Sequence, residues 1–461
     1  MDYNLLIIGS GPGGYHAAIR AAQLGLNTAV VEKEYVGGVC LNVGCIPTKA
    51  LLHVADELRG AKHATDYGIT FGAPDIDLKA LDKWKGGVVQ KLTGGVRSLL
   101  KGNKVTLLEG EATFEDANTV RVGDKTVTAE KIIIATGSAP IEIPGFETNG
   151  DTIVNSTGAL IVSEVPKRFL CIGGGAIGLE FSDIYNALGS EVTVVELMGQ
   201  IVPGSDPDVA KELAKSLKKR GIDIKTETKA VSQKKTDDGI EVTLENTAGK
   251  QETLVVDKVL VAVGRRPTSK GFGLEKIGVE VERGFITTNA HMQTNLDHIY
   301  AIGDVTKAPL LAHKAMKEGL VAAEHASGQP SAYDTVTPSV VYTNPELASV
   351  GMSEKEARDE GREIIVGTFP LQASGRAMAL GITEGLVKVI ADKETDVLLG
   401  FHMVGPGAGD IVAEAALGIE MGATLEDISL TQHAHPTIAE GFMEAAEAAH
   451  GKAVHIANKR R

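Results

Sequence analysis

Short runs of consecutive apolar residues recur along the chain, and several end at a glycine or an acidic residue. Five such runs are residues 5–8, 132–135, 170–172, 259–263 and 299–302. A strand buried on both faces has this composition, whereas a strand with one face in water alternates apolar and polar positions. Segments of helical length follow the first and third runs. The pattern therefore predicts an α/β protein with parallel sheets, and Pro267 predicts a turn after the fourth run.

Two stretches of the chain repeat one another. The first runs from Gly9 to Glu32 and the second from Gly173 to Glu196, so each spans 23 positions (32 − 9 and 196 − 173). Each copy has the order strand, glycine turn, helix, strand and terminal acid, which is the βαβ unit that binds dinucleotides. One glycine motif alone is weak, and glycine-rich turns without a ligand are the alternative, but two copies in register favour two dinucleotide sites. The predicted contacts are Gly9, Gly11, Gly14 and Glu32 in the first copy, and Gly173, Gly175, Gly178 and Glu196 in the second.

The acid that closes the second copy bears on which nicotinamide dinucleotide is bound. Glu196 is followed by residues 197–203, which contain no arginine. A 2′-phosphate would meet a carboxylate with no cationic partner in that stretch, so NAD is favoured over NADP.

Two of the three cysteines lie close together. Cys40 and Cys45 are separated by four residues, and Pro47 suits the first turn of a helix that would begin near Cys45. A helix N-terminus favours the thiolate, so the pair is predicted to be redox-active. Zinc binding and an inert pair are the alternatives, although no second cysteine pair supplies further zinc ligands. Cys171 lies in an apolar run and is expected to be a buried strand residue.

Size and charge narrow the class of protein. A chain of 461 residues is long enough for three or four domains. A net charge of −14, with no basic face in the sequence, argues against nucleic-acid binding. No apolar run reaches the length of a membrane span, and no signal sequence is recognised at the N-terminus, so the expected location is the cytoplasm without a membrane contact.

These motifs together resemble the FAD-dependent pyridine nucleotide–disulfide oxidoreductases over essentially the whole chain, and within that family the dihydrolipoamide dehydrogenases. The most specific segments are residues 38–49, 173–180, 312–315 and 433–440. The resemblance implies an α/β fold with two Rossmann-like dinucleotide-binding domains, for FAD and NAD, plus a C-terminal α+β dimerisation domain. The implied borders are 1–142 for the first part of the FAD domain, 143–267 for the NAD domain, 268–336 for a central domain that completes the FAD site, and 337–461 for the dimerisation domain.

The resemblance also assigns the reacting residues. Cys40 would form the mixed disulfide with the substrate, and Cys45 would be the thiol nearest the flavin. Lys49 and Glu180 resemble a lysine–glutamate pair beside the flavin, for which a surface ion pair is the alternative. His435 and Glu440 resemble an acid–base dyad. A base of this kind is required because a dithiol is largely protonated near neutral pH. Metal binding by His433 and His435 is the alternative, with no supporting ligand cluster in sight.

Further residues are expected to contact the cofactors. Gly137 and Asp304 follow predicted strands, at the sheet edge where ligands bind, and Asp304 could reach a cofactor polyol. A turn or helix-cap role is the alternative for Asp304. By resemblance, Ala112 and Ala312 would touch FAD through their backbone, while Ala230 and Gly264 would line the NAD groove.

The expected function follows from these assignments. The chain would oxidise protein-bound dihydrolipoamide through Cys40, Cys45 and FAD and reduce NAD⁺, as part of a 2-oxo acid dehydrogenase complex. Its partners would be a second copy of the chain, lipoyl-carrying domains and a subunit-binding domain. The alternatives are a purely structural docking subunit and a disulfide-independent NADH oxidase or diaphorase. NADPH-dependent glutathione reductases fit poorly because of Glu196, and relatives with C-terminal redox cysteines fit poorly because no cysteine follows Cys171.

Overall fold

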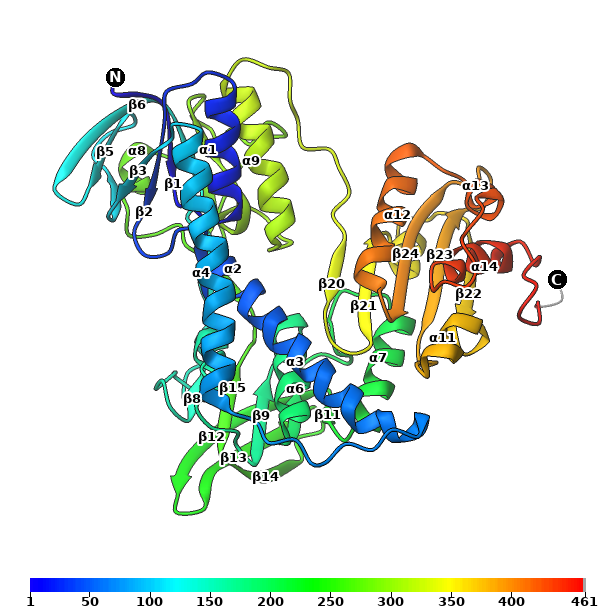
Figure 1. Ribbon diagram of the computed structural model, residues 1–461. Helices are drawn as coiled ribbons and strands as arrows, with labels where there is room; N and C mark the ends of the chain where they lie inside the picture. Colours follow the sequence, from blue (N-terminus) through cyan, green and yellow to red (C-terminus); the bar gives the residue numbers. More distant parts are fainter. Residues whose placement is uncertain (459–461) are drawn as a thin grey trace. The chain divides into compact units, whose positions relative to one another are not determined.

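The computed structural model describes residues 1–458 (Figure 1). The chain divides into two compact units. Unit 1 comprises Met1–Ala50, Ile76–Ile141 and Gly264–Asp334. Unit 2 comprises Leu51–Asp75, Glu142–Val263 and the described chain from Thr335 onward. This division is coarser than the four domains expected from the sequence, whose borders remain predictions.

Unit 1 is built on a sheet with a parallel core. The strand order is β3-β2-β1-β6-β5-β4, with β19 beside β6. β1, β2, β3, β6 and β19 are parallel, whereas β5 pairs antiparallel with β6 and with β4. The bounds are β1 (Tyr3–Ile8), β2 (Thr28–Glu32), β3 (Thr106–Glu109), β4 (Ala112–Phe114), β5 (Thr119–Val122), β6 (Lys125–Ile134) and β19 (Ile299–Ala301).

Three helices cover one face of this sheet. They are α1 (Pro12–Gln23), α4 (Leu78–Gly102) and α9 (Ala312–Ala326), and α1 and α9 lie side by side (Figure 1). Leu5 and Ile7 of β1 are fully buried against them in one apolar cluster, whereas Leu6 and Ile8 point into a cluster on the opposite face. The all-apolar first run is therefore explained by burial on both faces, as predicted.

Pro267 does not begin a turn, contrary to the sequence-based expectation. It ends a short strand, β16 (Arg265–Pro267), which pairs antiparallel with β7 (Ser138–Pro140). A two-stranded ribbon leaves one side of each strand without a ladder, so a residue lacking an N–H is tolerated there. The remaining short elements of unit 1 are α2 (Gly38–Val43), α8 (Leu274–Ile277), β17 (Val281–Glu282) and β18 (Phe285–Ile286).

The first half of unit 2 repeats the parallel arrangement. Its sheet has the order β11-β10-β9-β15-β8, and an antiparallel sheet, β12-β13-β14, packs on one face through a shared apolar cluster. The strands are β8 (Ile153–Val154), β9 (Arg168–Ile172), β10 (Glu191–Val195), β11 (Asp223–Lys225), β12 (Thr228–Thr236), β13 (Gly239–Asn246), β14 (Gln251–Val256) and β15 (Lys258–Val261). The helices are α5 (Ser156–Ala159), α6 (Ala176–Leu188) and α7 (Pro207–Lys219).

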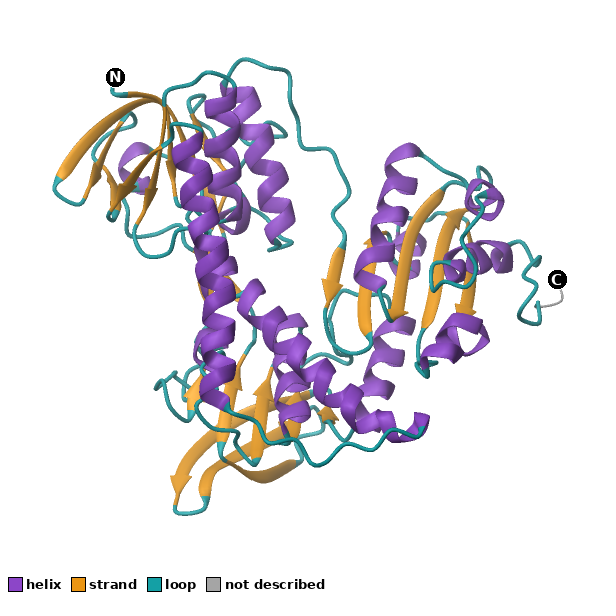
Figure 2. Ribbon diagram, viewed as in Figure 1, coloured by secondary structure: helices purple, strands orange, loops and turns teal. Residues whose placement is uncertain are grey.

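The C-terminal part of unit 2 is a five-stranded antiparallel sheet flanked by helices (Figure 2). The strand order is β20-β21-β24-β23-β22, formed by β20 (Ser339–Val341), β21 (Glu346–Gly351), β22 (Ile364–Pro370), β23 (Leu386–Asp392) and β24 (Leu398–Gly405). The helices are α10 (Glu354–Asp359), α11 (Gly375–Leu380), α12 (Ala408–Met421), α13 (Leu425–Leu430) and α14 (Glu440–Ala449). Two parallel α/β folds and one antiparallel α+β fold confirm the predicted fold class.

One helical stretch, Gly38–Tyr67, is long and apolar enough to cross a membrane by length and composition. The expectation that no such stretch exists is therefore wrong by this criterion. The stretch includes both cysteines of the close pair, and 39% of its most apolar window is buried in the fold. A single such helix is weak support for a membrane contact, because core helices of soluble proteins have the same composition.

Candidate active site

The first glycine turn joins β1 to α1 in a conformation that requires glycine. Gly9 has φ +105°, and a Cβ there would lie 2.3 Å from the Ala135 carbonyl oxygen. A Cβ at Gly14 would lie 1.9 Å from the Gly9 carbonyl oxygen, so the helix can pack against the strand end only without one. The N-cap residue of α1 is Gly11, which has no side chain to cap the helix. Its first N–H groups are thus suited to an anionic ligand such as a pyrophosphate.

Glu32, at the end of β2, holds this turn in place. One carboxylate oxygen, Oε2, accepts hydrogen bonds from the Ser10 N–H (2.9 Å) and the Ser10 hydroxyl (2.7 Å). The other, Oε1, accepts from the backbone N–H groups of Lys33 and Glu34, at 2.9 Å each. The terminal acid therefore orders the glycine turn, and its contact with a cofactor ribose stays a prediction.

The second glycine turn, between β9 and α6, has the same construction. Gly173 has φ +112°, and a Cβ there would lie 2.4 Å from the Ala262 carbonyl oxygen. A Cβ at Gly178 would lie 2.0 Å from the Gly173 carbonyl oxygen. Glu196 accepts hydrogen bonds from Gly174 N–H (2.7 Å) and Met198 N–H (2.8 Å). No side chain caps α6, whose N-cap residue is Gly175.

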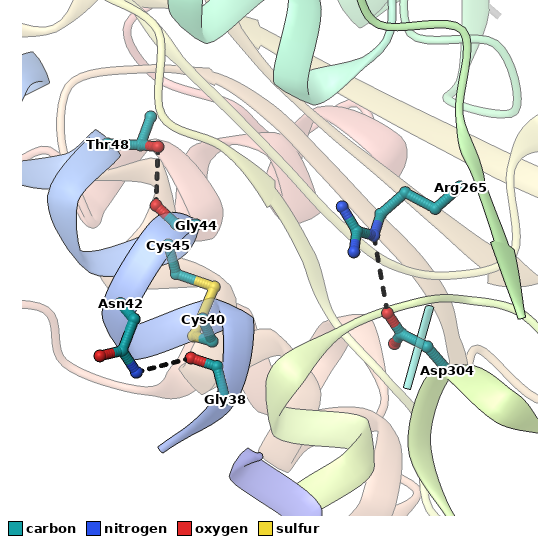
Figure 3. Close-up of a disulfide and its surroundings, with 8 residues drawn as sticks. All are labelled: Gly38, Cys40, Asn42, Gly44, Cys45, Thr48, Arg265 and Asp304. Carbon is teal, nitrogen blue, oxygen red and sulfur yellow. Dashed lines mark hydrogen bonds and ion pairs between the residues drawn. A yellow bond between two sulfur atoms is a disulfide. The ribbon is translucent and has the colours of Figure 1, made fainter. Parts of the chain in front are cut away.

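Cys40 and Cys45 form a disulfide with a Cα–Cα separation of 4.6 Å (Figure 3). Cys40 lies in α2, and Cys45 is the first residue of α3 (Cys45–His63), as the position of Pro47 predicted. Asn42 Nδ2 donates to the Gly38 carbonyl at 2.8 Å, and Thr48 Oγ1 donates to the Gly44 carbonyl at 2.7 Å. These side-chain bonds lie within the short helix α2 and at the start of α3, the two helices that carry the sulfurs.

The cysteine segment also touches the first glycine turn. Gly37 N–H donates to the Ser10 carbonyl at 3.1 Å. A Cβ at Gly38, which has φ +65°, would lie 2.5 Å from the Gly11 Cα. Unit 1 therefore brings the dinucleotide turn and the disulfide together, as the sequence-based hypothesis requires.

Asp304, the other acid expected near the flavin, lies in the 3-10 helix Gly303–Val305. Its Oδ2 accepts a hydrogen bond from the Ser138 hydroxyl at 2.5 Å. The Ser138 hydroxyl in turn accepts from Arg265 Nε at 2.7 Å, and Arg265 Nε stands 4.0 Å from Asp304 Oδ2 (Figure 3). Burial lowers the pKa of the Arg265 guanidinium, and the Asp304 carboxylate partly offsets this effect. Sequence reasoning missed Ser138 and Arg265, because their proximity depends on the pairing of β7 with β16.

His435 and Glu440 form the predicted dyad in unit 2. His435 Nδ1 lies 2.8 Å from Glu440 Oε1, and Glu440 Oε2 accepts from the Thr437 N–H at 2.7 Å. Burial raises the pKa of the Glu440 carboxyl, but the bonds from Thr437 and His435 outweigh this and lower it, so the carboxylate is the favoured form. The His435 side chain is 79% exposed, which leaves Nε2 accessible to a substrate.

His433 cannot play the same part. Its Nε2 lies 3.1 Å from Glu414 Oε1 and its Nδ1 lies 2.9 Å from the Thr431 carbonyl oxygen, so both ring nitrogens are engaged. Within the described residues, no group of three or more His, Cys, Asp or Glu side chains is arranged to hold a metal ion.

The remaining predicted residues are distributed over both units. Lys49 is the fifth residue of α3, in unit 1, whereas Glu180 is buried on α6 in unit 2 and accepts a hydrogen bond from the Tyr342 N–H at 3.0 Å. Their pairing therefore stays a prediction. The other positions are Ala112 in β4, Gly137 after β6, Ala230 in β12, Gly264 after β15 and Ala312 at the start of α9.

Cys171, in β9, lies outside the disulfide. It is fully buried, and burial raises the pKa of its thiol to about 12. The expectation of a buried strand residue is confirmed.

Comparison with known proteins agrees with this geometry. Residues 3–319 match the family described as pyridine nucleotide-disulphide oxidoreductase, and residues 337–446 match its dimerisation domain, which supports a homodimer. A dihydrolipoyl dehydrogenase from Thermus scotoductus is 56% identical over 99% of both chains. Another, from Geobacillus stearothermophilus, is 49% identical over 100% of this chain and 98% of the relative.

Solved structures resemble the whole chain as well. The HOCl-induced flavoprotein disulfide reductase RclA from Escherichia coli is 28% identical with a TM-score of 0.86, covering 96% of this chain and 99% of that one. LpdA from Mycobacterium tuberculosis is 26% identical with a TM-score of 0.87 over the same shares. The family and its dihydrolipoyl dehydrogenases use FAD and NAD. Two glycine turns, a redox disulfide and these full-length matches lead to one conclusion: the chain belongs to the pyridine nucleotide-disulphide oxidoreductase family.

Proposed function

We propose that this chain is the NAD-dependent dehydrogenase that oxidises protein-bound dihydrolipoamide to lipoamide. The observation that carries the proposal is the Cys40–Cys45 disulfide at the N-terminus of α3, on a segment whose Gly38 lies against Gly11 of the glycine turn. Both cysteines are partly exposed, and a disulfide that a small dithiol can reach suits thiol–disulfide exchange. Full-length relatives at 49% and 56% identity are dihydrolipoyl dehydrogenases, which favours this dithiol over other disulfide substrates.

In the proposed half-reaction, His435 removes a proton from one thiol of dihydrolipoamide. The resulting thiolate attacks Cys40 Sγ, a mixed disulfide forms, the Cys40–Cys45 bond breaks, and Cys45 leaves as a thiolate. The second substrate thiol then attacks the substrate sulfur of the mixed disulfide as its proton passes to the leaving Cys40 sulfur, which releases lipoamide and leaves Cys40 as a thiol and Cys45 as a thiolate. Glu440 holds the His435 imidazole through Nδ1 and stabilises its protonated form. The exposure of His435 fits a base that acts on a site completed by a second copy of the chain.

The chain's residues fit both dinucleotides. For FAD they are the uncapped N-terminus of α1, Gly9, Gly11, Gly14, Glu32, Ala112, Gly137, Asp304 and Ala312, with Lys49 and Glu180 beside the ring. For NAD they are the uncapped N-terminus of α6, Gly173, Gly175, Gly178, Glu196, Ala230 and Gly264. When bound, FAD supplies the two-electron carrier between the cysteine pair and NAD⁺.

The finer assignments are part of the same proposal. The four domain borders given from the sequence are retained. The partners are lipoyl-carrying domains and the subunit-binding domain of a 2-oxo acid dehydrogenase complex, in the cytoplasm. The names of the relatives and the match to the dimerisation domain support this assembly.

The test is NADH formation by the purified flavoprotein with dihydrolipoamide and NAD⁺, with NADP⁺ in parallel. Cys45→Ser should abolish turnover while FAD stays bound. As a control, Cys171→Ala changes the buried cysteine outside the disulfide and should leave turnover unchanged. Dye reduction by NADH should survive in Cys45→Ser because it needs no disulfide. Full lipoamide turnover in Cys45→Ser would refute the proposal.

A further inference from the structure

The turn that carries Asp304 is held by charged groups on two sides. On one side are Ser138 and Arg265, described above. On the other side, the Gly303 N–H donates to Glu318 Oε2 at 2.7 Å, and Glu318 Oε1 lies 2.7 Å from Lys314 Nζ. Lys314 and Glu318 both belong to α9, so this helix is hydrogen-bonded directly to the backbone of the turn.

Lys314 also reaches the end of the turn. Its Nζ donates to Thr306 Oγ1 at 3.3 Å, and the Thr306 hydroxyl donates to the Gly303 carbonyl at 2.7 Å. Both polar groups of Gly303 are thereby engaged, the N–H by Glu318 and the carbonyl by Thr306. Gly303 has φ +75°, so its backbone occupies a conformation that most residues avoid.

The Lys314–Glu318 pair is almost entirely buried, with side chains 2% and 1% exposed. A buried ion pair is a poor source of stability, because desolvation of both charges offsets their attraction, and apolar residues of similar volume often replace it without loss. Burial raises the pKa of Glu318, and Lys314 counters that effect only in part. Stability alone therefore does not explain why a charged pair is buried at this position.

Helix α9 contacts the glycine turn too. A Cβ at Gly319 would lie 2.4 Å from the Gly13 carbonyl oxygen, and a Cβ at Gly13 would lie 2.8 Å from the Ala315 carbonyl oxygen. The backbones of α1 and α9 thus touch within one turn of the ion pair. One rigid helix sets the relative position of the glycine turn and the Asp304 turn.

We propose that Lys314 and Glu318 are positioning residues for FAD: they fix the Gly303–Thr306 turn so that Asp304 already stands where a hydroxyl of the cofactor's polyol is bound. The inference rests on the proposed contact between FAD and Asp304. Glu318 acts through the Gly303 N–H, Lys314 holds the Glu318 side chain in place, and neither touches the cofactor.

The decisive variants remove the charges while preserving volume. Lys314→Met/Glu318→Leu removes the acceptor for the Gly303 N–H, whereas Lys314→Met/Glu318→Gln keeps one. FAD is removed from each variant, and the dissociation constant for FAD rebinding to the apoprotein is measured by quenching of flavin fluorescence. The leucine variant should bind FAD about tenfold or more weakly, as expected for loss of a hydrogen bond to a charged acceptor, and the glutamine variant should recover most of the affinity. Thermal unfolding of the glutamine variant's apoprotein should stay close to that of the parent, whereas the leucine variant leaves the buried Gly303 N–H without an acceptor and should unfold at a lower temperature.

The exposed pair Lys355–Asp359 on α10 has the same spacing and provides the matched control. Lys355→Met/Asp359→Leu should leave FAD binding unchanged. Asp304→Ala is measured beside these variants. If Asp304→Ala weakens FAD binding and the leucine variant does not, the inference is overturned and the proposed FAD site stands. If Asp304→Ala has no effect either, the proposed contact and the inference both fall.

A measurement on the unmodified chain covers the case in which the leucine variant does not fold. In wild-type apoprotein, the amides of residues 303–306 should exchange slowly with deuterium, and FAD should add little further protection. Fast exchange that slows only when FAD binds would mean that the cofactor orders the turn, which would overturn the inference.

Discussion

The two glycine turns of this chain make the same close contacts between backbone segments, but different elements surround them. At equivalent positions, Gly9 and Gly173 have φ values of +105° and +112°, and each backs onto a carbonyl oxygen of the neighbouring strand end. Gly14 and Gly178 lie five residues later (14 − 9 and 178 − 173) and touch the first glycine of their own turn. The positions set by the contact between helix and strand are therefore the same in both repeats.

The repeats differ one residue earlier. Gly13 lies four residues after Gly9, and its counterpart four residues after Gly173 is Ile177. Gly13 is needed because α9 crosses α1 at this point, with the Ala315 carbonyl oxygen 2.8 Å from where a Cβ would be. Ile177, in contrast, is only partly buried. The glycines shared by both turns are therefore required by the strand–turn–helix motif itself. The unshared glycine, Gly13, is required by the helix that packs against the first turn.

The largest expected effect comes from filling the shared close contact. Gly14→Val and Gly178→Val each force a side chain against backbone, and each should cost at least about 3 kcal/mol of stability. The first should yield protein without flavin, whereas the second should keep FAD and lose NAD binding. Visible flavin absorbance and an NADH titration distinguish them, with Gly60→Ala in open space on α3 as the control. Equal loss of flavin from both variants would mean that the two folds do not behave as separate sites.

The unshared position should give a smaller and one-sided effect. Gly13→Ala brings a methyl group into contact with the Ala315 carbonyl oxygen, so a loss of about 1–3 kcal/mol is expected, together with weaker FAD binding. Ile177→Ala adds no new contact and should leave flavin content unchanged. Thermal unfolding of the apoproteins measures the difference, and normal stability of Gly13→Ala would show that α1 and α9 have room to separate.

Gly175→Ala tests whether a glycine is required by a ligand instead of by the fold. Gly175 has φ −79°, and nothing lies within 4 Å of a Cβ built there. The free energy of unfolding should change little or rise by up to about 1 kcal/mol. NAD affinity should fall about tenfold, because the methyl group would stand where a pyrophosphate approaches the backbone. Unchanged affinity in an NADH titration would argue against pyrophosphate binding at this turn.

The smallest effect concerns the residue after the first glycine. Ser10 adds a hydroxyl bond to Glu32, whereas Gly174 bonds Glu196 through its N–H alone. Ser10→Ala should therefore cost about 1 kcal/mol and weaken FAD binding only a few-fold, since the backbone bond remains. Urea unfolding and FAD titration check this, and a loss as large as that of Gly13→Ala would contradict it.

The sequence was sufficient wherever the constraint is local. Glycine offsets, terminal acids and the position of Pro47 depend on a few consecutive residues, and the structure reproduces all of them. The buried Lys314–Glu318 pair could not be predicted, because its burial depends on packing between distant segments. On a helix, lysine and glutamate four residues apart are typical of an exposed surface. Pro267 was expected to mark a turn because the strand that pairs with Arg265–Pro267, at Ser138–Pro140, lies more than one hundred residues away. The Lys49–Glu180 pair was predicted from the family alone and awaits a test.

The burial of Cys171 has a practical consequence for chemical labelling. The chain has three cysteines, and the one in β9 is fully buried with its thiol pKa raised to about 12. Alkylating reagents react with accessible thiolates, so the native oxidised protein should take up almost no label. After mild reduction, the label incorporated per chain becomes a direct titration of the Cys40–Cys45 pair, and a third equivalent marks unfolding of the second nucleotide fold.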